Sequence, residues 1–458
     1  MIREFISWII IFIADLISFF IILIATFFIR KWMGEYGILP PYYMTLKKLF
    51  LTWWMPAIYM LSFAFHKLYT FRFPFWEESK RIIKAIFFAT ITILAIVSLG
   101  KLTDKVSRTT VIMMAIFSIF IFPAERKIVK TLLYKIGLWQ RKITAIGNKN
   151  FIKTISGIFN SEAFMGYVVS HSIEINKEFS IKELKDIPQN VAVISIPKDL
   201  EEPETFLAKV QRLTKTFFFV PEIKGLAFLN SELFPLFFSE VFLLHVKNNL
   251  KSPLNKFLKS CFDIGISIII ILPLLLPIIG IIAILIKLDS KGPVFFVHRR
   301  IGKHGKPIKI IKFRTMYTDA QERLKKLFEE NPEAKKEWET YYKLKNDPRV
   351  TKVGKFLRKT SLDELPQIVN VIKGDMSLVG PRPVIKEEID KYYKEFAQYY
   401  YMVKPGISGL WQVSGRSDTD YEKRVRLDTW YVLNWSLWLD IVILIKTVKT
   451  VLKKEGAY

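Results

Sequence analysis

The sequence predicts a membrane protein with four N-terminal transmembrane helices, a Rossmann-like α/β domain, and a mainly α domain that carries a re-entrant membrane helix and interfacial amphipathic helices. Three observations lead to this fold class. Several apolar runs are long enough to cross a bilayer. Short β-rich runs then alternate with polar, helix-compatible stretches. A later apolar run is interrupted by prolines and flanked by lysines. We therefore divide the chain into residues 1–140, 141–250 and 251–458.

Composition supports a membrane protein that handles phosphate. The chain has 458 residues, 51% of them apolar, and a formal net charge of +26. Lys and Arg neutralise phosphate wherever it occurs, so nucleic acid, anionic lipid and phosphorylated substrates all fit this charge. The apolar runs favour lipid and phosphorylated substrates, and we expect no nucleic-acid partner. Cys261 is the only cysteine, which excludes a disulfide framework or a cysteine-rich zinc site within one chain.

The first apolar run covers residues 5–29, and at about 1.5 Å per residue it can cross a core of roughly 30 Å. Asp15 is its one acidic residue, and no small-residue cleavage pattern marks it as a signal peptide. Three further spans are expected near residues 49–66, 82–100 and 109–123. The basic segment that begins at Glu125 then predicts an exit on the cytosolic side.

The segment 141–250 has the pattern of a parallel α/β domain. Its predicted strands are ITAIG, GYVVS, VAVISIP, FFFV and VFLLHV. The first turn begins at Gly147 and lacks the further glycines of a G-x-G-x-x-G phosphate loop. We expect a structural or regulatory domain, and ligand binding there stays open.

A second long apolar run covers residues 262–286. Pro273 and Pro277 interrupt it, and each proline removes a backbone donor, so a straight helix is not expected. A kinked transmembrane helix and a re-entrant helix both fit this pattern. Basic residues precede and follow the run, which favours a re-entrant helix with both ends on the cytosolic side.

The segment Ser361-Leu-Asp-Glu-Leu-Pro-Gln places two adjacent carboxylates, Asp363 and Glu364, before Pro366, a residue favoured in the first turn of a helix. Ser361 and Glu364 also match a capping box, so plain helix capping explains these seven residues well. The functional alternative is that one carboxylate attacks phosphorus while the other helps to hold Mg²⁺.

Cationic side chains lie close to this carboxylate pair in sequence. Guanidinium groups bind phosphate in bidentate fashion and lysine binds it as a point charge, although each such residue alone is more often a solvated surface charge. Glycine and proline around one arginine fix its local backbone. The candidates are Lys312, Arg314, Arg358 and Arg382, the last flanked by Pro381 and Pro383.

The C-terminal stretch 430–449 reads as one helix with an aromatic belt and lysines at its end. This composition favours a helix in the lipid headgroup region, with core packing as the alternative.

Three long ordered segments, 286–316, 346–383 and 404–440, resemble the bacterial sugar transferase family of monotopic phosphoglycosyl transferases. They include IKLDSKGP, TSLDELPQ, SLVGPRP and KPGISGLWQ. The resemblance covers essentially the whole chain and is closest to the large subgroup that includes undecaprenyl-phosphate galactose and glucose phosphotransferases. It implies that the proline-broken helix is re-entrant, because Pro277 lies at the matching distance before IKLDSKGP.

The resemblance also implies a reaction. Asp363 would be the nucleophile that forms a covalent sugar-phosphoryl intermediate and releases UMP from a UDP-sugar. Glu364 would assist with Mg²⁺ or with a proton, while Lys312, Arg358 and Arg382 match positions used around phosphate and nucleotide. The acceptor would be a polyprenyl phosphate at the cytosolic face of the bacterial inner membrane, in exopolysaccharide, capsule or O-antigen synthesis.

Two other functions stay open. A catalytically silent membrane scaffold or sensor with a ligand-binding α/β domain would use the carboxylates only for capping. A polytopic transferase would need acidic residues within its spans, which are nearly free of them. The resemblance favours galactose, then glucose, as the sugar, and the sequence leaves a homo-oligomer open.

Overall fold

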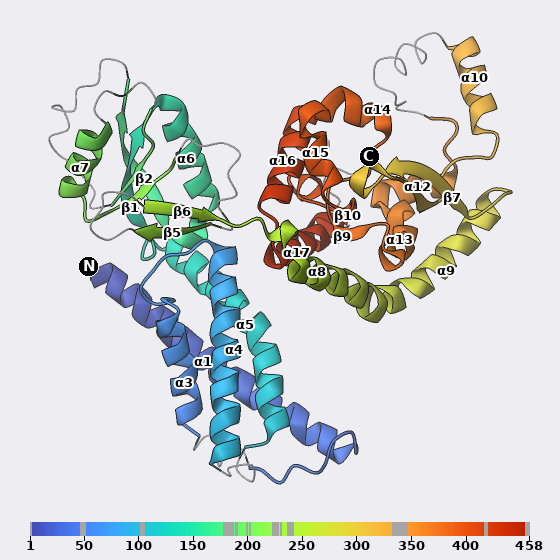
Figure 1. Ribbon diagram of the computed structural model, residues 1–458. Coiled ribbons are helices and arrows are strands. Elements are labelled where there is room, and N and C mark those ends of the chain that lie inside the picture. The colour runs from blue at the N-terminus through green and yellow to red at the C-terminus, as the bar shows by residue number, and fades with distance from the viewer. Residues whose placement is uncertain are drawn as a thin grey trace. The chain divides into compact units, whose positions relative to one another are not determined.

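The computed structural model describes residues 2–45, 52–100, 106–176, 187, 191–197, 200, 203–221, 229, 231–235, 242–331, 347–415 and 420–453. The chain divides into two compact units, Met1–Ile223 and Lys224–Tyr458. Figure 1 gives the element labels used below.

The first unit begins with a group of apolar helices. They are α1 (Ile2–Glu35), α3 (Trp54–Phe65), α4 (Phe75–Leu99) and α5 (Arg108–Lys135). Helix α5 packs on both α1 and α4, and α3 packs on α4. Aromatic rings fill the space between them, among them Phe19, Tyr59, Phe63 and Phe122, all almost fully buried.

A buried ion network ties three of these helices together. Arg126 of α5 donates to Asp15 of α1 at 2.6 Å and to Glu78 of α4 at 2.9 Å. Lys130 of α5 also pairs with Glu78. Removing one member of such a network leaves an uncompensated buried charge, which typically costs about 3–5 kcal/mol. Asp15, which the sequence showed as an isolated acid in an apolar run, is therefore neutralised by the fold.

Three helices of the described residues are long and apolar enough to cross a membrane: Arg3–Glu35, Phe75–Leu99 and Pro253–Asp289. The span expected at residues 49–66 corresponds to α3, which has 12 residues and covers only about 18 Å. The remainder of that expected span lies partly outside the described residues. The chain is a membrane protein, and its four N-terminal spans stay a prediction.

The α/β part of the first unit contains a parallel four-stranded sheet in the order β2-β1-β3-β4. Its strands are β1 (Arg141–Gly147), β2 (Tyr167–Glu174), β3 (Val191–Ile194) and β4 (Thr216–Phe219). Alternate residues of β1 and β3 face α6 (Lys149–Ser161) and α7 (Pro203–Leu213), which cover opposite faces of the sheet (Figure 1). The parallel α/β fold predicted here is present.

The last predicted strand of that domain pairs differently. β6 (Phe242–Val246) is antiparallel to β5 (Ser231–Pro235), in a separate two-stranded sheet within the second unit. The prediction that this strand joins the parallel sheet is wrong. An apolar run identifies a strand but not its partner, because register and pairing depend on segments distant in sequence.

The second unit begins with a long helix that bends. α8 (Pro253–Ile266) passes through a π-helical turn, η6 (Ser267–Ile271), into α9 (Leu272–Asp289), and Figure 1 shows the two arms meeting at an angle. Pro273 and Pro277 both lie in α9, just after this turn. Their missing N–H groups leave the preceding turn short of hydrogen bonds, which explains a bend at this point.

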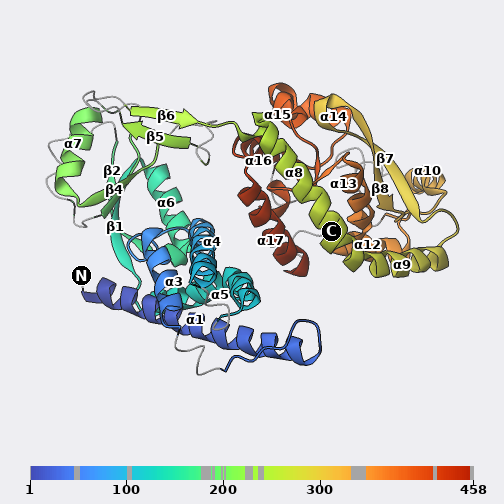
Figure 2. The ribbon, with the colours of Figure 1, turned by 60° about the horizontal axis from the view of Figure 1, so that its bottom comes forward.

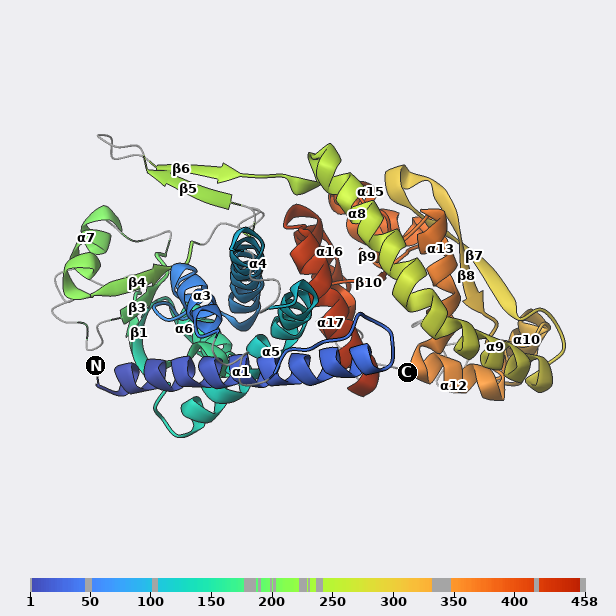
Figure 3. The ribbon, with the colours of Figure 1, turned by 90° about the horizontal axis from the view of Figure 1, so that it is seen from below.

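Both arms of the bent helix pack on the same folded unit. α8 contacts α13 (Ile368–Lys373) and α9 contacts α12 (Lys352–Thr360), as Figures 2 and 3 show. Asp289, at the end of α9, accepts a hydrogen bond from the backbone N–H of Val353 in α12 at 2.9 Å. The bent helix still exposes most of its apolar side chains, since only 6% of its most apolar window is buried within the chain.

Two small sheets and several short helices complete the second unit. An antiparallel hairpin is formed by β7 (Phe295–Ile301) and β8 (Pro307–Phe313), and a parallel pair by β9 (Ser377–Val379) and β10 (Gly406–Ser408). The remaining helices of this unit are α10 (Ala320–Glu330), α14 (Lys386–Glu388), α15 (Ala397–Tyr401), α16 (Tyr421–Leu433) and α17 (Leu437–Lys453), with short 3-10 or π turns at Asn249–Lys251, Lys303–Gly305, Leu362–Gln367, Ile389–Tyr393, Lys394–Phe396 and Trp411–Val413. A further 3-10 turn, Ala163–Met165, lies in the first unit.

The expected C-terminal helix is two helices. α16 ends at Leu433 and α17 begins at Leu437. Tyr431 and Trp435 are almost fully buried, and both donate hydrogen bonds to the carboxylate of Asp440. For these two rings the headgroup interpretation is wrong and core packing is correct, because the break between the helices turns them onto a buried carboxylate.

Candidate active site

The hairpin β7–β8 carries Lys312 into the site. Lys312 lies opposite Phe296 in the hairpin register, and His298 lies opposite Ile310. Side chains alternate between the two faces of a strand, so Lys312 and Ile310 share a face with Phe296, His298 and Arg300 of the other strand. The hairpin therefore presents three basic side chains to one side.

The carboxylate pair lies on a short 3-10 helix, η8 (Leu362–Gln367), that directly follows α12. Ser361, between the two helices, has a left-handed backbone (φ 56°, ψ 19°), and its side chain makes no capping hydrogen bond. The capping box suggested by the sequence is therefore absent. Ser361 therefore does not engage the carboxylate pair as a helix cap.

Arg382 is positioned by close backbone contacts among glycines. A Cβ on Gly406 would lie 2.1 Å from the backbone N of Gly380, and a Cβ on Gly409 would lie 2.2 Å from the backbone O of Gly380. This approach permits hydrogen bonds from the N–H of Gly406 to the carbonyl of Pro381 and from the N–H of Gly380 to the carbonyl of Ser408, both 2.9 Å long. The backbone that directly precedes Arg382 is thus fixed by two hydrogen bonds.

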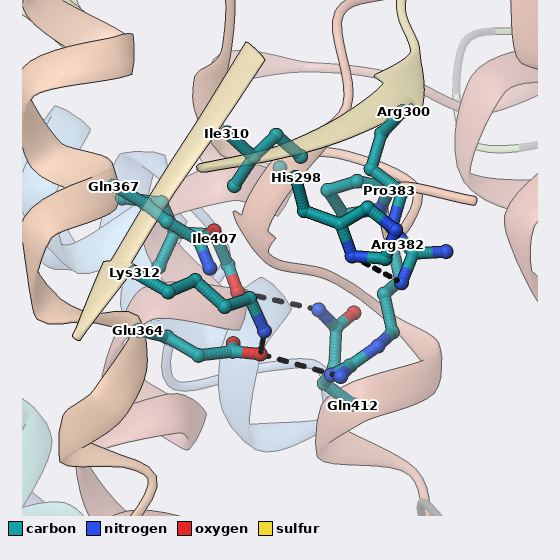
Figure 4. Close-up of a pocket in the computed structure, with 11 residues that line it drawn as sticks. His298, Arg300, Ile310, Lys312, Glu364, Gln367, Arg382, Pro383, Ile407 and Gln412 are labelled. Atoms are coloured by element: carbon teal, nitrogen blue, oxygen red, sulfur yellow. Dashed lines mark hydrogen bonds and ion pairs between the residues drawn. The ribbon is translucent and has the colours of Figure 1, made fainter. Parts of the chain in front are cut away.

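Lys312, Glu364 and Arg382 converge on one point (Figure 4). The Nζ atom of Lys312 lies 2.7 Å from Oε1 of Glu364 and 4.0 Å from Oδ2 of Asp363. Nη2 of Arg382 lies 3.2 Å from the same Glu364 oxygen. Glu364 therefore binds two cations, while Lys312 lies within reach of both carboxylates.

Asp363 is largely buried, with 16% of its side chain exposed. Burial raises the pKa of Asp363 above its usual range; Lys312, Arg358 and Arg382 oppose this shift, and Glu364 adds to it. Burial lowers the pKa of Arg358, and the charge of Asp363 raises it. A carboxylate with little solvation keeps its oxygens available for reaction, and the cations around it favour its ionised form.

The predicted phosphate-binding residues separate into two groups. Lys312, Arg382 and Pro383 line a cavity beside Glu364. Arg358 lies outside this lining, and its Nε donates to the hydroxyl of Thr315 at 2.9 Å. Arg314 also lies outside it: this buried guanidinium donates to the carbonyls of Ser290 and Lys291 at 2.8 and 2.6 Å. Arg314 thus holds the loop after α9 through these hydrogen bonds.

Sequence reasoning missed several cavity residues. His298, Arg300, Gln367 and Gln412 line the cavity together with Lys312 and Arg382 (Figure 4). Burial lowers the pKa of His298, and the charges of Arg300 and Lys312 lower it further, which favours the neutral form of its ring. The alternation of His298 and Arg300 along β7 was a usable signal, whereas the two glutamines come together only through folding.

The cavity has the chemistry of an anion site with a nucleophile beside it. Arg300, Lys312 and Arg382 outnumber Glu364, so the lining is positively charged. The described residues contain no group of three or more His, Cys, Asp or Glu side chains that could hold a metal alone. The fold and the site define a membrane protein with a basic cavity that Glu364 lines and with Asp363 directly next to Glu364 in the chain.

Comparison with known proteins gives the family. The model of the family described as bacterial sugar transferase matches residues 254–454. An undecaprenyl-phosphate galactose phosphotransferase of Salmonella typhimurium is 40% identical over 85% of this chain and 84% of its own length. A UDP-galactose-lipid carrier transferase of Erwinia amylovora is 37% identical over 85% of this chain and 84% of its own length. The chain belongs to the bacterial sugar transferase family.

A shorter relative also matches. The exopolysaccharide production protein ExoY of Rhizobium meliloti is 45% identical over 220 residues, which are 48% of this chain and 96% of ExoY. A protein about half as long as this chain is therefore almost completely covered by the match.

Proposed function

We propose that this protein transfers a hexose 1-phosphate from a UDP-sugar to a polyprenyl phosphate and releases UMP. The observation that carries the proposal is the placement of Asp363 and Glu364. They do not cap a helix, and they lie within 4.0 Å of Lys312 at the edge of a basic cavity. The two long relatives are an undecaprenyl-phosphate galactose phosphotransferase and a UDP-galactose-lipid carrier transferase, and both names support the same reaction and galactose as the sugar.

The proposed reaction proceeds in two displacements at phosphorus. A carboxylate oxygen of Asp363 attacks the sugar-bearing phosphorus of the donor, and the phosphorus–oxygen bond to UMP breaks. An oxygen of the polyprenyl phosphate then attacks the sugar-phosphoryl aspartate, and the bond to Asp363 breaks. Both steps move negative charge, which Lys312 and Arg382 offset from fixed positions without reorganising.

The residues present fit Mg²⁺ as the proposed cofactor. This ion is commonly held by one or two carboxylates together with water and substrate phosphate oxygens. Asp363 and Glu364 are adjacent carboxylates beside the anion cavity, so these two residues would hold it. Bound Mg²⁺ would neutralise part of the diphosphate charge, and Lys312 would then shift from Glu364 toward a phosphate oxygen.

We also propose that the bent helix α8–α9 is re-entrant and that the second unit lies on the cytosolic face of the bacterial inner membrane. Both arms pack on the same unit, and their outer faces are apolar. Lysines precede α8 and follow α9, in agreement with a shared cytosolic side. This placement brings a soluble anionic donor and a membrane-anchored acceptor to one carboxylate.

The test is a single-turnover burst with the purified full chain. Incubation with a UDP-sugar and Mg²⁺, without lipid acceptor, should release one equivalent of UMP and leave sugar phosphate on the protein. Asp363→Asn should abolish both signals, since asparagine matches the shape of aspartate without its nucleophilic oxygen. Glu364→Gln should slow the burst and weaken its dependence on Mg²⁺, because a neutral amide is a poorer ligand for a hard cation.

Two outcomes would contradict the proposal. A wild-type protein that releases no UMP with any UDP-sugar, with or without lipid acceptor, would favour a silent scaffold or sensor. Labelling of the Asp363→Asn variant at the normal rate would exclude Asp363 as the nucleophile and would point to Glu364 or to a direct displacement.

A further inference from the structure

A second cavity in the second unit shares no lining residue with the cavity beside Glu364. Its volume is about 80 Å³, several times the roughly 10–15 Å³ that one water needs. Four lysines line it: Lys256 and Lys259 from α8, Lys303 after β7, and Lys404 before β10.

The positive charge of this cavity is only partly matched. Lys259 pairs with Asp263 at 3.1 Å and with Asp440 at 2.7 Å. Within the part of the chain that the structure describes, no acidic side chain lies within 4.0 Å of the other three lysine ammonium groups. Four lysines thus face two carboxylates, and two positive charges remain for a ligand.

The three unmatched lysines repel one another. Burial lowers the pKa of Lys303, and the charges of Lys256 and Lys404 lower it further. Like charges gathered in a partly buried site are unfavourable until an anion joins them. The arrangement therefore favours a ligand with a compact double or single negative charge, such as a phosphate.

Helix α8 forms one wall of the cavity with one of its faces, and its other face is apolar. Lys256, Lys259 and Asp263 follow helical spacing and share the face that lines the cavity. The other face exposes Leu254, Phe257 and Leu258, with 64%, 65% and 43% of each residue accessible. A molecule with a phosphate in the cavity could therefore lay an apolar chain along the outer face of α8.

We propose that this second cavity binds the phosphate of an anionic membrane phospholipid. Lysines near a bilayer surface attract anionic headgroups, and Met402, Val403 and Trp435 supply apolar walls beside them. The phosphate of a lipid bound here is not positioned for reaction, because neither Asp363 nor Glu364 lines the cavity. The occupant is therefore distinct from the acceptor of the proposed transfer.

Two chain segments connect this cavity with the candidate active site. Residues 377–383 line the second cavity with Ser377 and Val379 and the first with Arg382 and Pro383. Residues 402–407 also line both cavities, the second with Met402 and the first with Ile407. A bound phospholipid would thus hold the backbone segments that position Arg382, and would anchor the second unit at the membrane surface.

The test uses the full chain in detergent micelles with a phosphatidylglycerol analogue that carries a diazirine near its headgroup. Photolabelled peptides are mapped by mass spectrometry. We expect labels on peptides that contain residues 256–263 and 402–404, with an excess of unlabelled phosphatidylglycerol removing them. Inorganic phosphate at matched concentration should compete at least tenfold less well, because it lacks the apolar chain.

The matched variants remove charge or space. Lys303→Gln combined with Lys404→Gln should reduce this labelling about tenfold or more, and Ser260→Phe should reduce it by filling the cavity without changing charge. Lys391→Gln combined with Lys423→Gln removes two exposed lysines that line neither cavity and should leave labelling unchanged.

Three results would overturn the proposal. Labels that survive both the double lysine variant and Ser260→Phe would place the lipid elsewhere. Equal competition by inorganic phosphate would show a site for a free anion. Preferential competition by undecaprenyl phosphate, at lower concentration than phosphatidylglycerol, would assign the cavity to the acceptor of the reaction.

Discussion

The Nζ atom of Lys312 lies 2.7 Å from Oε1 of Glu364, although 51 residues separate the two in the chain. The contact joins β8 to η8, and it places a cation beside the carboxylate pair from a different element. Hydrogen bonds between charged groups contribute more than neutral ones, at about 1.5–3 kcal/mol. We therefore expect loss of this contact to change the rate of transfer.

Replacement of Lys312 by methionine keeps the length and apolar part of the side chain and removes its charge. We expect kcat/KM for transfer to fall about 10- to 100-fold, because a cation beside the diphosphate is lost. Lys309→Met is the matched control: Lys309 is exposed on the same strand and points to the opposite face. Steady-state assays of UMP release measure both variants, and an equal loss in the two would argue against a specific role for Lys312.

The raised pKa of Asp363 has a consequence for stability. Burial favours the protonated form in the folded state, so the stability that this proton provides is lost as pH rises through the folded pKa. At pH 7 the buried carboxylate is therefore a destabilising group. Asp363→Asn should raise the unfolding temperature by a few degrees at pH 7, and the gain should shrink as pH falls through the raised folded pKa and disappear below the unfolded value of about 4.

Asp347 provides a control, because its pKa is shifted in the opposite direction from that of Asp363. Burial alone would raise the pKa of Asp347, but hydrogen bonds and charge from Arg349 lower it below its usual value. The stability from this ion pair is present above the unfolded pKa and is lost as pH falls. Asp347→Asn should therefore lower the unfolding temperature at pH 7, and a loss for both variants would show that burial of Asp363 is not a net cost.

The glycine contacts predict a strong steric effect. A Cβ on Gly406 would lie 2.1 Å from the backbone N of Gly380 and 2.4 Å from the carbonyl of Ser408, so Gly406→Ala should destabilise the second unit by about 1–3 kcal/mol or prevent its folding. Gly265→Ala, in α8, is the control, because its Cβ would meet no atom within 4 Å. Thermal unfolding in detergent compares the two, and an unaffected Gly406→Ala variant would contradict the close approach.

If the helix α8–α9 is re-entrant, Lys256 and Lys291 lie on the same side of the membrane. Lys256→Cys and Lys291→Cys, each in a Cys261→Ser background, should react with a membrane-impermeant maleimide only when the cytosolic face is accessible. Cytosolic labelling of both positions in inverted vesicles, with protection in intact spheroplasts, fits one shared side. Labelling of the two positions from opposite sides would instead show a spanning helix.

A fragment that begins at residue 251 should be active, because the candidate site lies after this point in the chain. Every residue that lines the first cavity, and both carboxylates, lie after residue 250. The shorter relative ExoY, which is almost completely covered by a match to half of this chain, supports the same boundary. A membrane-inserted fragment 251–458 should retain measurable transfer. An inactive fragment with the wild-type circular dichroism of this unit would place an essential residue earlier in the chain.

Local signals predicted much of this architecture. Apolar length gave the membrane helices α1, α4 and α8–α9, and strand alternation gave the parallel sheet from β1 to β4. The same local signals failed where pairing is not local. β6 joined an antiparallel hairpin, and the break between α16 and α17 buried two rings that had the composition of an interfacial belt.

The candidate site shows the same division. The motif around Asp363 and Glu364 identified the carboxylates, but it fitted a capping box equally well. The left-handed backbone of Ser361 removed that alternative, and a backbone angle of this kind is set by the turn from α12 into η8. Arg314, which resembled its neighbours in charge, was separated from the cavity by its hydrogen bonds to Ser290 and Lys291.

The sequence by itself determined that this is a membrane protein of the bacterial sugar transferase family and which residues are its candidate reactive groups. The length of an apolar run and the order of residues in a motif are properties of the sequence itself, so they can be read without knowledge of the fold. The tertiary structure alone decided which cations meet those groups. Lys312 lies on β8, Glu364 on η8 and Arg382 in the loop after β9, and ion pairs depend on distances of a few ångströms that only folding can set.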